Sequence, residues 1–206
     1  QAVKTTSSPS FTGLTVGTLT GILKGTTGVV SVATSGTDFS FPASIKIIHS
    51  TGLETNYTPA ANTDVERGNS LLTALSSAAS GDSIILIEAT YDCGSSQVII
   101  PGGVSIWGKG KNLTKITTTY ASGSYLNSFS LADGVSIHDV NLDMSLMNGT
   151  FQYGVGSPDN STVYLYNVLI TGDSDGLYIR GSSGTRNIYL YNCNINTHYD
   201  DFNDTS

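Results

Sequence analysis

Apolar and polar residues alternate through the second half of the chain, and the alternation recurs at a fixed distance. Residues 163–170 read VYLYNVLI, and residues 188–195, which begin 25 residues later, read IYLYNCNI; five of the eight positions are identical. Residues 135–142, VSIHDVNL, form a fainter copy. Alternation predicts strands that bury one face, and a repeat of this length predicts a solenoid in which each copy is one coil.

The alternation also predicts which side chains face the interior. Val163 and Leu165 point to one face of their strand, and Leu190 takes the corresponding place in the next copy. In a closed coil that face is the core, and the tyrosines between the apolar residues point outward. We therefore predict an all-β fold, a right-handed parallel β-helix over residues 83–206, with Leu165 directly beneath Leu190.

Each copy contains an Asn or Asp at the same place. Asn167 and Asn192 interrupt the strand pattern, and Asp139 holds that position in the fainter copy. These residue types tolerate positive φ and form hydrogen bonds with nearby backbone, so they suit a tight corner between two strands. We expect stacked coils to align their side chains in a ladder.

A helical pattern precedes the repeat. Three apolar residues fall on one face of a helix: Leu71, Leu75 and Ala78. Asn69 or Ser70 can cap its start, and Gly81 can end it. We expect this helix to cover the open end of the solenoid. Residues 83–91, SIILIEATY, then predict the first strand, apolar on both faces because the helix and the core cover it.

The first 50 residues have a different pattern. Residues 11–21, FTGLTVGTLTG, alternate apolar and hydroxyl side chains with frequent glycines. Short strands of this kind cannot build a core alone, so we predict an extended segment whose core is shared among identical chains; a flexible Thr/Gly linker is the alternative. The predicted division is residues 1–50 as the extended segment, residues 51–82 as a boundary loop with the capping helix, and residues 83–206 as the coils.

Composition and charge argue against some classes of binding partner. Charged residues make up 12 % of the chain and the net charge is −7. Without a basic stripe to neutralise phosphates, nucleic acid is excluded as a partner. No apolar run approaches membrane-spanning length, so we expect no membrane insertion.

Cys193 takes the place of Val168 in the repeat, which favours a small core residue over a disulfide with Cys93. Residues 108–111, GKGK, lack the spacing of a phosphate-binding loop, so we predict a turn there and no cofactor.

The N-terminal segment carries a distinctive phrase. Residues 21–25, GILKG, and 29–39, VVSVATSGTDF, resemble a linker module common in bacteriophage tail fibres. The resemblance implies a homotrimeric shaft, a virion and therefore extracellular location, and contacts of this segment with other tail proteins.

A second resemblance concerns the start of the solenoid. Residues 64–116 combine a short helix, an apolar strand ending in Tyr91 and the phrase VSIWGKG at residues 104–110. This order is similar to the opening of pectate-lyase-like β-helix proteins, which include many tailspikes. It implies the fold and is silent on activity.

Three aspartates are the candidate catalytic residues: Asp175, Asp200 and Asp201. With coils in register, Asp175 and Asp201 stack about 4.8 Å apart. Close carboxylates raise one another's pKa, which suits the acid and base roles of glycosidic cleavage. The pattern resembles the Asn-Thr-Asp-Gly and Gly-Asp-Asp-Cys motifs of polygalacturonases, although Tyr199 and Phe202 replace the Gly and Cys of the second motif. Turn formation and Ca²⁺ or glycan contact are alternative roles of these residues.

Four outward tyrosines form the candidate glycan-binding patch: Tyr164, Tyr166, Tyr189 and Tyr191. Aromatic side chains in such a patch can contact sugar rings, lie in an interface between subunits, or simply favour the strand. His138 occupies an outward position of the fainter copy.

Three functions fit these observations. The first is a homotrimeric tail fibre or tailspike that binds host-surface polysaccharide, the second a polysaccharide-degrading hydrolase that uses the three aspartates, and the third a bacterial cell-surface adhesin. The phrase at residues 21–39 favours the first. Because residue 206 falls within a coil, we expect the chain to continue.

Overall fold

The computed structural model describes residues 23–26, 29–32, 45–120, 127–146, 153–172, 175–179, 184–197 and 202–204. The chain forms two compact units, Gln1–Ser40 and Phe41–Ser206. In the first unit, β1 (Leu23–Thr26) and β2 (Val29–Val32) form an antiparallel hairpin.

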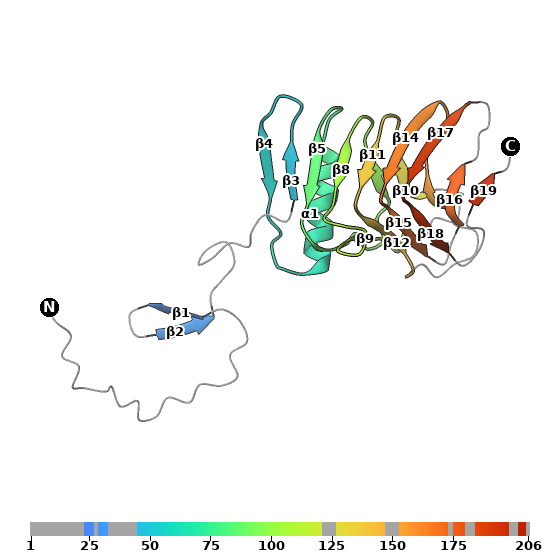
Figure 1. The fold of residues 1–206 in the computed structure, drawn as a ribbon. Helices are drawn as coiled ribbons and strands as arrows, with labels where there is room; N and C mark the ends of the chain where they lie inside the picture. The colour runs from blue at the N-terminus through green and yellow to red at the C-terminus, as the bar shows by residue number, and fades with distance from the viewer. Residues whose placement is uncertain are drawn as a thin grey trace, which may run out of the picture. The chain divides into compact units, whose positions relative to one another are not determined.

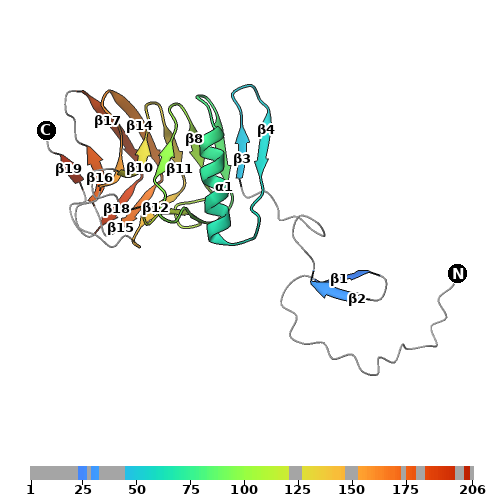
Figure 2. The ribbon, with the colours of Figure 1, turned by 180° about the vertical axis from the view of Figure 1, so that it is seen from behind.

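The second unit is built from three sheets (Figures 1 and 2). Sheet I contains, in order, β4 (Glu54–Tyr57), β3 (Ile45–Ile48), β5 (Ser83–Leu86), β8 (Ser105–Trp107), β11 (Ser136–His138), β14 (Ser161–Tyr166) and β17 (Arg186–Tyr191). Sheet II contains β6 (Ala89–Asp92), β9 (Thr114–Thr117), β12 (Asn141–Met144), β15 (Leu169–Gly172) and β18 (Asn194–Thr197). Sheet III contains β7 (Val98–Ile100), β10 (Asn127–Leu131), β13 (Tyr153–Gly156), β16 (Asp175–Ile179) and β19 (Phe202–Asp204).

From β5 onward, each turn of the chain contributes one strand to each sheet, and neighbouring turns pair in parallel. The sheets therefore stack as a β-solenoid, and the predicted parallel β-helix is confirmed. Its right-handed sense is the one that parallel crossovers favour.

The register within sheet I follows the sequence repeat. Leu190 pairs with Leu165, and Leu165 pairs with Ile137, as the repeat predicted. Leu190 itself is 41 % exposed rather than buried, because β17 is the last described strand of sheet I. Ile137 and Leu165 are fully buried, as are the corresponding residues Ile84 and Ile106 of earlier coils. Burying each such side chain stabilises the fold by about 1.5–3 kcal/mol, so the inward column is a major part of the core.

Corners between sheets I and II contain the Asn and Asp of the repeat. Asp139, Asn167 and Asn192 have φ of 58°, 53° and 56°. The side-chain amide of Asn167 donates to Asp139 Oδ1 at 2.6 Å, and that of Asn192 donates to Asn167 Oδ1 at 3.0 Å. The predicted ladder is confirmed.

Helix α1 (Asp64–Ser77) lies against β6 at the start of the solenoid, as predicted for a cap (Figure 1). Its limits differ from the prediction. Thr63 is the N-cap and its Oγ1 accepts a hydrogen bond from the Glu66 amide at 3.3 Å, so Asn69 and Ser70 lie inside the helix. The spacing of Thr63 and Glu66 is that of a capping box, which starts the helix despite the poor helix formers that follow.

Gly81 does not end the helix. The C-cap is Ala78, whose amide donates to Ala74 and Leu75 carbonyls. Gly81 follows in a turn with φ of +90°, and its amide donates to the Gly103 carbonyl at 2.9 Å. The glycine therefore serves the connection into β5.

The predicted first strand is divided in two. Residues 83–91 form β5 and the start of β6, with a corner at Ile87 and Glu88. Ile84 and Leu86 are fully buried, whereas Ser83 and Ile85 on the other face of β5 are only partly buried, so the prediction of two covered faces is wrong. The fully buried Tyr91 stabilises the corner, because its hydroxyl accepts a hydrogen bond from the Ile87 amide at 3.0 Å.

The boundary between the units lies after Ser40 rather than after residue 50. Strand β3 pairs antiparallel with β5 and buries Ile45 and Ile47, and β4 forms where a boundary loop was predicted. The hairpin β3–β4 thus pairs with the outer side of β5, the first strand of the coils, whose backbone would otherwise be unpaired there.

Candidate functional site

A column of aromatic side chains runs across the outer face of sheet I. Trp107, His138, Tyr166 and Tyr191 occupy paired positions of β8, β11, β14 and β17. Each follows an inward-facing residue by one position, so strand alternation points all four rings outward.

The rings stack face to face along this column. Ring centroids are 3.6 Å apart between Trp107 and His138, 4.6 Å between His138 and Tyr166, and 4.7 Å between Tyr166 and Tyr191, with interplanar angles of 6–8°. The two longer separations match the spacing of strands in a sheet, about 4.8 Å, whereas Trp107 and His138 are in closer contact. The register of the solenoid therefore positions the rings.

A second, shorter column lies beside the first. Tyr164 stacks on Tyr189 with centroids 5.2 Å apart, and Tyr164 lies 6.4 Å from Tyr166. We call the combined set the aromatic strip: Trp107, His138, Tyr164, Tyr166, Tyr189 and Tyr191. The strip is two rings wide at β14 and β17 and one ring wide at β8 and β11.

The strip is open to solvent along its edge. Trp107, Tyr189 and Tyr191 are 40 %, 45 % and 49 % exposed. Because neighbouring rings cover one another's faces, a ligand would meet ring edges and tyrosine hydroxyl groups along most of the strip. Such a surface can form apolar contacts and hydrogen bonds with the same ligand.

His138 lies in the middle of the strip. Burial by the flanking rings lowers the pKa of its imidazole, and the carboxylate of Asp139 opposes this in part. The ring is therefore neutral at neutral pH.

The structure brings the four predicted tyrosines together and adds two residues that the sequence analysis did not assign. Residues 104–107, VSIW, and 135–138, VSIH, align with one another, so Trp107 and His138 take the same outward position. That alignment was the available signal. It was missed because the repeat was defined by tyrosine and asparagine.

The three predicted catalytic aspartates fall at the limits of the described chain. Asp175 begins β16, where it pairs with Tyr153, but its side chain is outside the described residues, as are Asp200 and Asp201. Strand β16 pairs with β19 so that Leu177 lies beside Phe202. The predicted stacking of Asp175 with Asp201 lies outside the described side chains, so the role of the three aspartates stays a prediction.

A buried carboxylate lies on the outer face of sheet II. Asp143 is 4 % exposed and accepts hydrogen bonds from Lys115 Nζ at 2.8 Å, the Ser145 amide at 2.9 Å and Thr171 Oγ1 at 3.0 Å. Burial alone would raise the pKa of Asp143, but the bonds from Lys115 and Ser145 outweigh it and hold the pKa below its ordinary value. With its oxygens occupied, this carboxylate has a structural role.

A second buried carboxylate joins the hairpin to the helix. Asp82 is 2 % exposed and accepts hydrogen bonds from the Ala79 amide, the Ser50 amide and His49 Nδ1, each at 3.0 Å. The bond from Ala79 does most to lower the pKa of Asp82, and those from Ser50 and His49 add to it against the opposing effect of burial. His49 Nε2 lies 2.9 Å from Thr55 Oγ1, so the chain of contacts ends on β4.

Comparisons with protein-family models, curated proteins and solved structures find no match for this chain. Within the described residues, no three His, Cys, Asp or Glu side chains gather in a way that could hold a metal ion. The described part of the chain also contains no helix long and apolar enough to cross a membrane.

Proposed function

We propose that this chain is part of a homotrimeric virion tail fibre or tailspike that acts outside the cell and binds host-surface glycans through the aromatic strip. Two features support the proposal: the outer face of the β-solenoid presents a continuous stack of aromatic rings, and the sequence of residues 21–39 resembles a tail-fibre linker. The N-terminal unit would then contact other tail proteins.

The observation that carries the proposal is the unbroken stack of rings on the outer face of β8, β11, β14 and β17. Trp107 is 40 % exposed at one end of the stack, and Tyr189 and Tyr191 stack on Tyr164 and Tyr166 of the preceding coil. Side chains held in this way lose little further conformational freedom when a ligand binds, which lowers the entropic cost of binding.

Removing the outermost rings tests the proposal. We expect the double variant Tyr189→Ala/Tyr191→Ala to bind surface polysaccharides about tenfold more weakly or worse, because each aromatic contact contributes about 0.5–1.5 kcal/mol. The measurement is binding of the full chain to a panel of purified bacterial surface polysaccharides. The matched control is Ile99→Ala, which removes a side chain that is 56 % exposed on β7 of sheet III.

Two results would contradict the proposal: the wild-type chain binds no polysaccharide of the panel, or the double variant binds as tightly as the control. A third result, in which the double variant dissociates the oligomer, would assign the strip to an interface between subunits.

Enzymatic cleavage of polysaccharide is the second candidate function, favoured by the pairing of β16 with β19. Asp175 opens β16, and Asp200 and Asp201 directly precede β19 in the sequence. If these carboxylates act as acid and base, Asp175→Asn and Asp201→Asn will each lower the rate of chain cleavage by at least 100-fold while leaving binding intact. Unchanged cleavage in both variants would remove the enzymatic function.

A further inference from the structure

The outer face of sheet I is uncharged over the length of the aromatic strip. Between β5 and β17, the outward strand positions that the structure describes form two columns. The first column consists of Ile85, Trp107, His138, Tyr166 and Tyr191. The second consists of Ser83, Ser105, Ser136, Tyr164 and Tyr189. Thr162 and Asn187 extend the face on the two longest strands.

Every residue of the second column carries a hydroxyl group: the tyrosines on β14 and β17, and the serines on β5, β8 and β11. Ser136 Oγ donates to Ser105 Oγ at 2.8 Å, and these residues lie in the same column as Tyr164 and Tyr189. Hydroxyl groups both donate and accept hydrogen bonds, so this column can pair with the hydroxyl groups of a sugar in either sense. A carboxylate ligand would find no cationic partner there.

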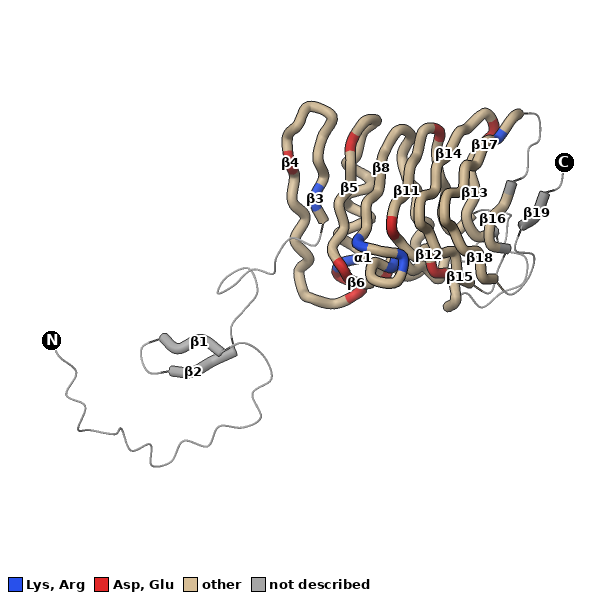
Figure 3. Tube along the Cα trace, in the orientation of Figure 1, with Lys and Arg blue, Asp and Glu red and all other residues tan. Residues whose placement is uncertain are grey.

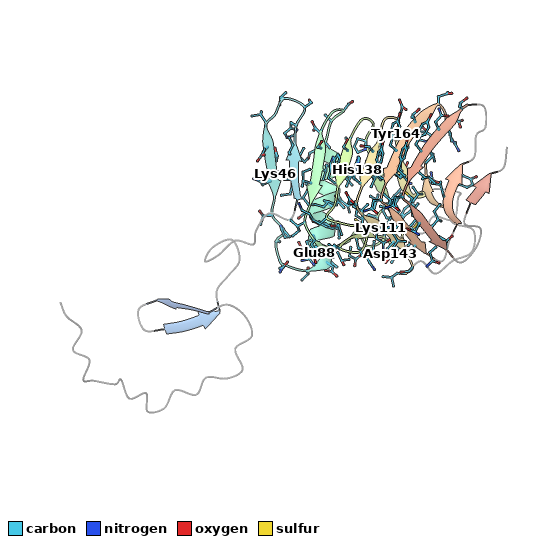
Figure 4. All side chains as sticks on the ribbon, viewed as in Figure 1. Lys46, Glu88, Lys111, His138, Asp143 and Tyr164 are labelled. Atoms are coloured by element: carbon cyan, nitrogen blue, oxygen red, sulfur yellow. The ribbon has the colours of Figure 1, made fainter. Side chains whose placement is uncertain are left out.

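Charged residues surround this face without entering it. Asp139 lies at the corner with sheet II, and Asp133 lies at the other end of the strands, where it accepts a hydrogen bond from the Thr162 amide at 2.7 Å. Lys46 borders the face on β3, where it pairs with Ile85 and forms an ion pair with Glu54 at 2.8 Å (Figures 3 and 4). The labelled Glu88, Lys111 and Asp143 lie away from His138 and Tyr164 in Figure 4. Lys111 Nζ is bound to Asn192 O and Asn194 Oδ1 at 3.1 and 2.6 Å.

The spacing of residues along the strip indicates how a bound polysaccharide would be oriented on the solenoid. One outward residue of each column recurs per coil, and the ring centroids from Trp107 to Tyr191 are 3.6, 4.6 and 4.7 Å apart. One pyranose unit adds slightly more than this to an extended polysaccharide, so a chain along the solenoid axis stays near the rings over a few units. It would meet one aromatic ring in each coil from β8 to β17.

We infer that the aromatic strip binds a linear, uncharged polysaccharide that lies along the solenoid axis, with about one pyranose unit per coil. The inference rests on the proposed glycan-binding function and specifies its ligand class. An acidic polysaccharide is disfavoured because no outward strand position described from β5 to β17 is cationic, and because the chain has a net charge of −7.

The test uses polysaccharides that differ only in charge. Neutral and acidic surface polysaccharides are presented to the full chain, and each acidic one is also presented after chemical reduction of its carboxylates to hydroxyl groups. We expect binding to neutral polysaccharides and to the reduced forms, at least tenfold tighter than to the acidic parents, with little change between low and high salt. Affinity for oligosaccharides of increasing length should level off near four units, one for each of β8, β11, β14 and β17.

A negative charge introduced on the outer face of sheet I is a second test, and the same charge introduced elsewhere on the surface is its control. Ser136→Asp should weaken binding of a neutral polysaccharide by at least tenfold, whereas Ser95→Asp, an exposed position in the turn before β7, should leave it unchanged. Thermal unfolding of both variants shows that the fold is retained, and Ser136→Ala, which adds no charge, should bind within threefold of wild type.

The outcomes separate this inference from the proposed function. Tighter binding of the acidic parents than of their reduced forms would overturn the uncharged ligand class and leave glycan binding standing. Absence of binding to every polysaccharide would overturn both. Affinity that does not depend on oligosaccharide length would overturn the axial orientation.

Discussion

At the residue scale, Gly68 shows how one missing side chain allows the helix to approach the solenoid. A Cβ at this position would overlap the carbonyl oxygen of Asp92 in β6, so α1 can lie against the strand only with glycine there. We expect Gly68→Ala to lower the free energy of unfolding by about 1–3 kcal/mol, because backbone must move to admit the methyl group. Urea denaturation measures this, with the exposed helix position Asn69→Ala as control. Equal stability of the two variants would contradict the close approach.

Asp82 is the second residue whose role is testable at this scale. Asp82→Ala leaves the amides of Ser50 and Ala79 without their acceptor, and a buried donor without a partner costs about 1–3 kcal/mol. The pKa of Asp82 is lower in the folded state than in the unfolded state. Its negative charge therefore contributes its full stabilisation at pH values above the unfolded-state pKa of about 3.9. That stabilisation is lost as the pH falls through the folded-state pKa.

This prediction is tested by measuring the melting temperatures of wild type and of Asp82→Ala from pH 7 to pH 2. Wild type should lose stability as the pH falls below about 4, and Asp82→Ala should start lower and change less over that range. Because the pKa of Asp143 is lowered in the same direction, some acid sensitivity remains in the variant. Parallel pH curves for the two proteins would show that Asp82 does not have this role.

At the scale of elements, the corner ladder connects successive coils. Asn167 has positive φ and both donates to Asp139 and accepts from Asn192. Asn167→Ala should cost about 2–3 kcal/mol, because it adds backbone strain to the loss of the side-chain hydrogen bonds. Asn167→Gly loses the same bonds without the strain, so thermal unfolding should place it between wild type and Asn167→Ala. The reverse order of the two variants would show that the corner does not require positive φ.

At the scale of the whole molecule, the proposed function requires a homotrimer. Because the sequence of residues 11–21 predicts short strands that gain a core only by sharing it, we expect the full chain to sediment as a trimer and a chain beginning at Phe41 to sediment as a monomer. Truncation after Ser40 follows the division between the two units and keeps β3 in the same chain as its partner β5. A full chain that remains monomeric and folded at high concentration would contradict the shared shaft.

Much of the fold was predictable from sequence because it depends on local and repeated information. The alternation around Leu165 and Leu190 predicts strands and inward positions, the distance between copies predicts the coil, and Asn167 and Asn192 predict corners. A parallel solenoid stacks each copy on the next, so the alignment of the repeats is also the register of the sheet. The four tyrosines of the strip were predicted for the same reason.

The sequence alone thus determined the coil, its register and its corners, since those follow from spacing along the chain. Only the tertiary structure decided that Trp107 and His138 complete the strip, that β3 joins sheet I from outside the repeat, and that Asp82 links hairpin to helix. The contacts of β3 and Asp82 join residues whose local sequence does not indicate their partners, whereas Trp107 and His138 align only once VSIW and VSIH are compared. All of these contacts exist because folding brings distant positions together, and burial there favours only groups that find a partner.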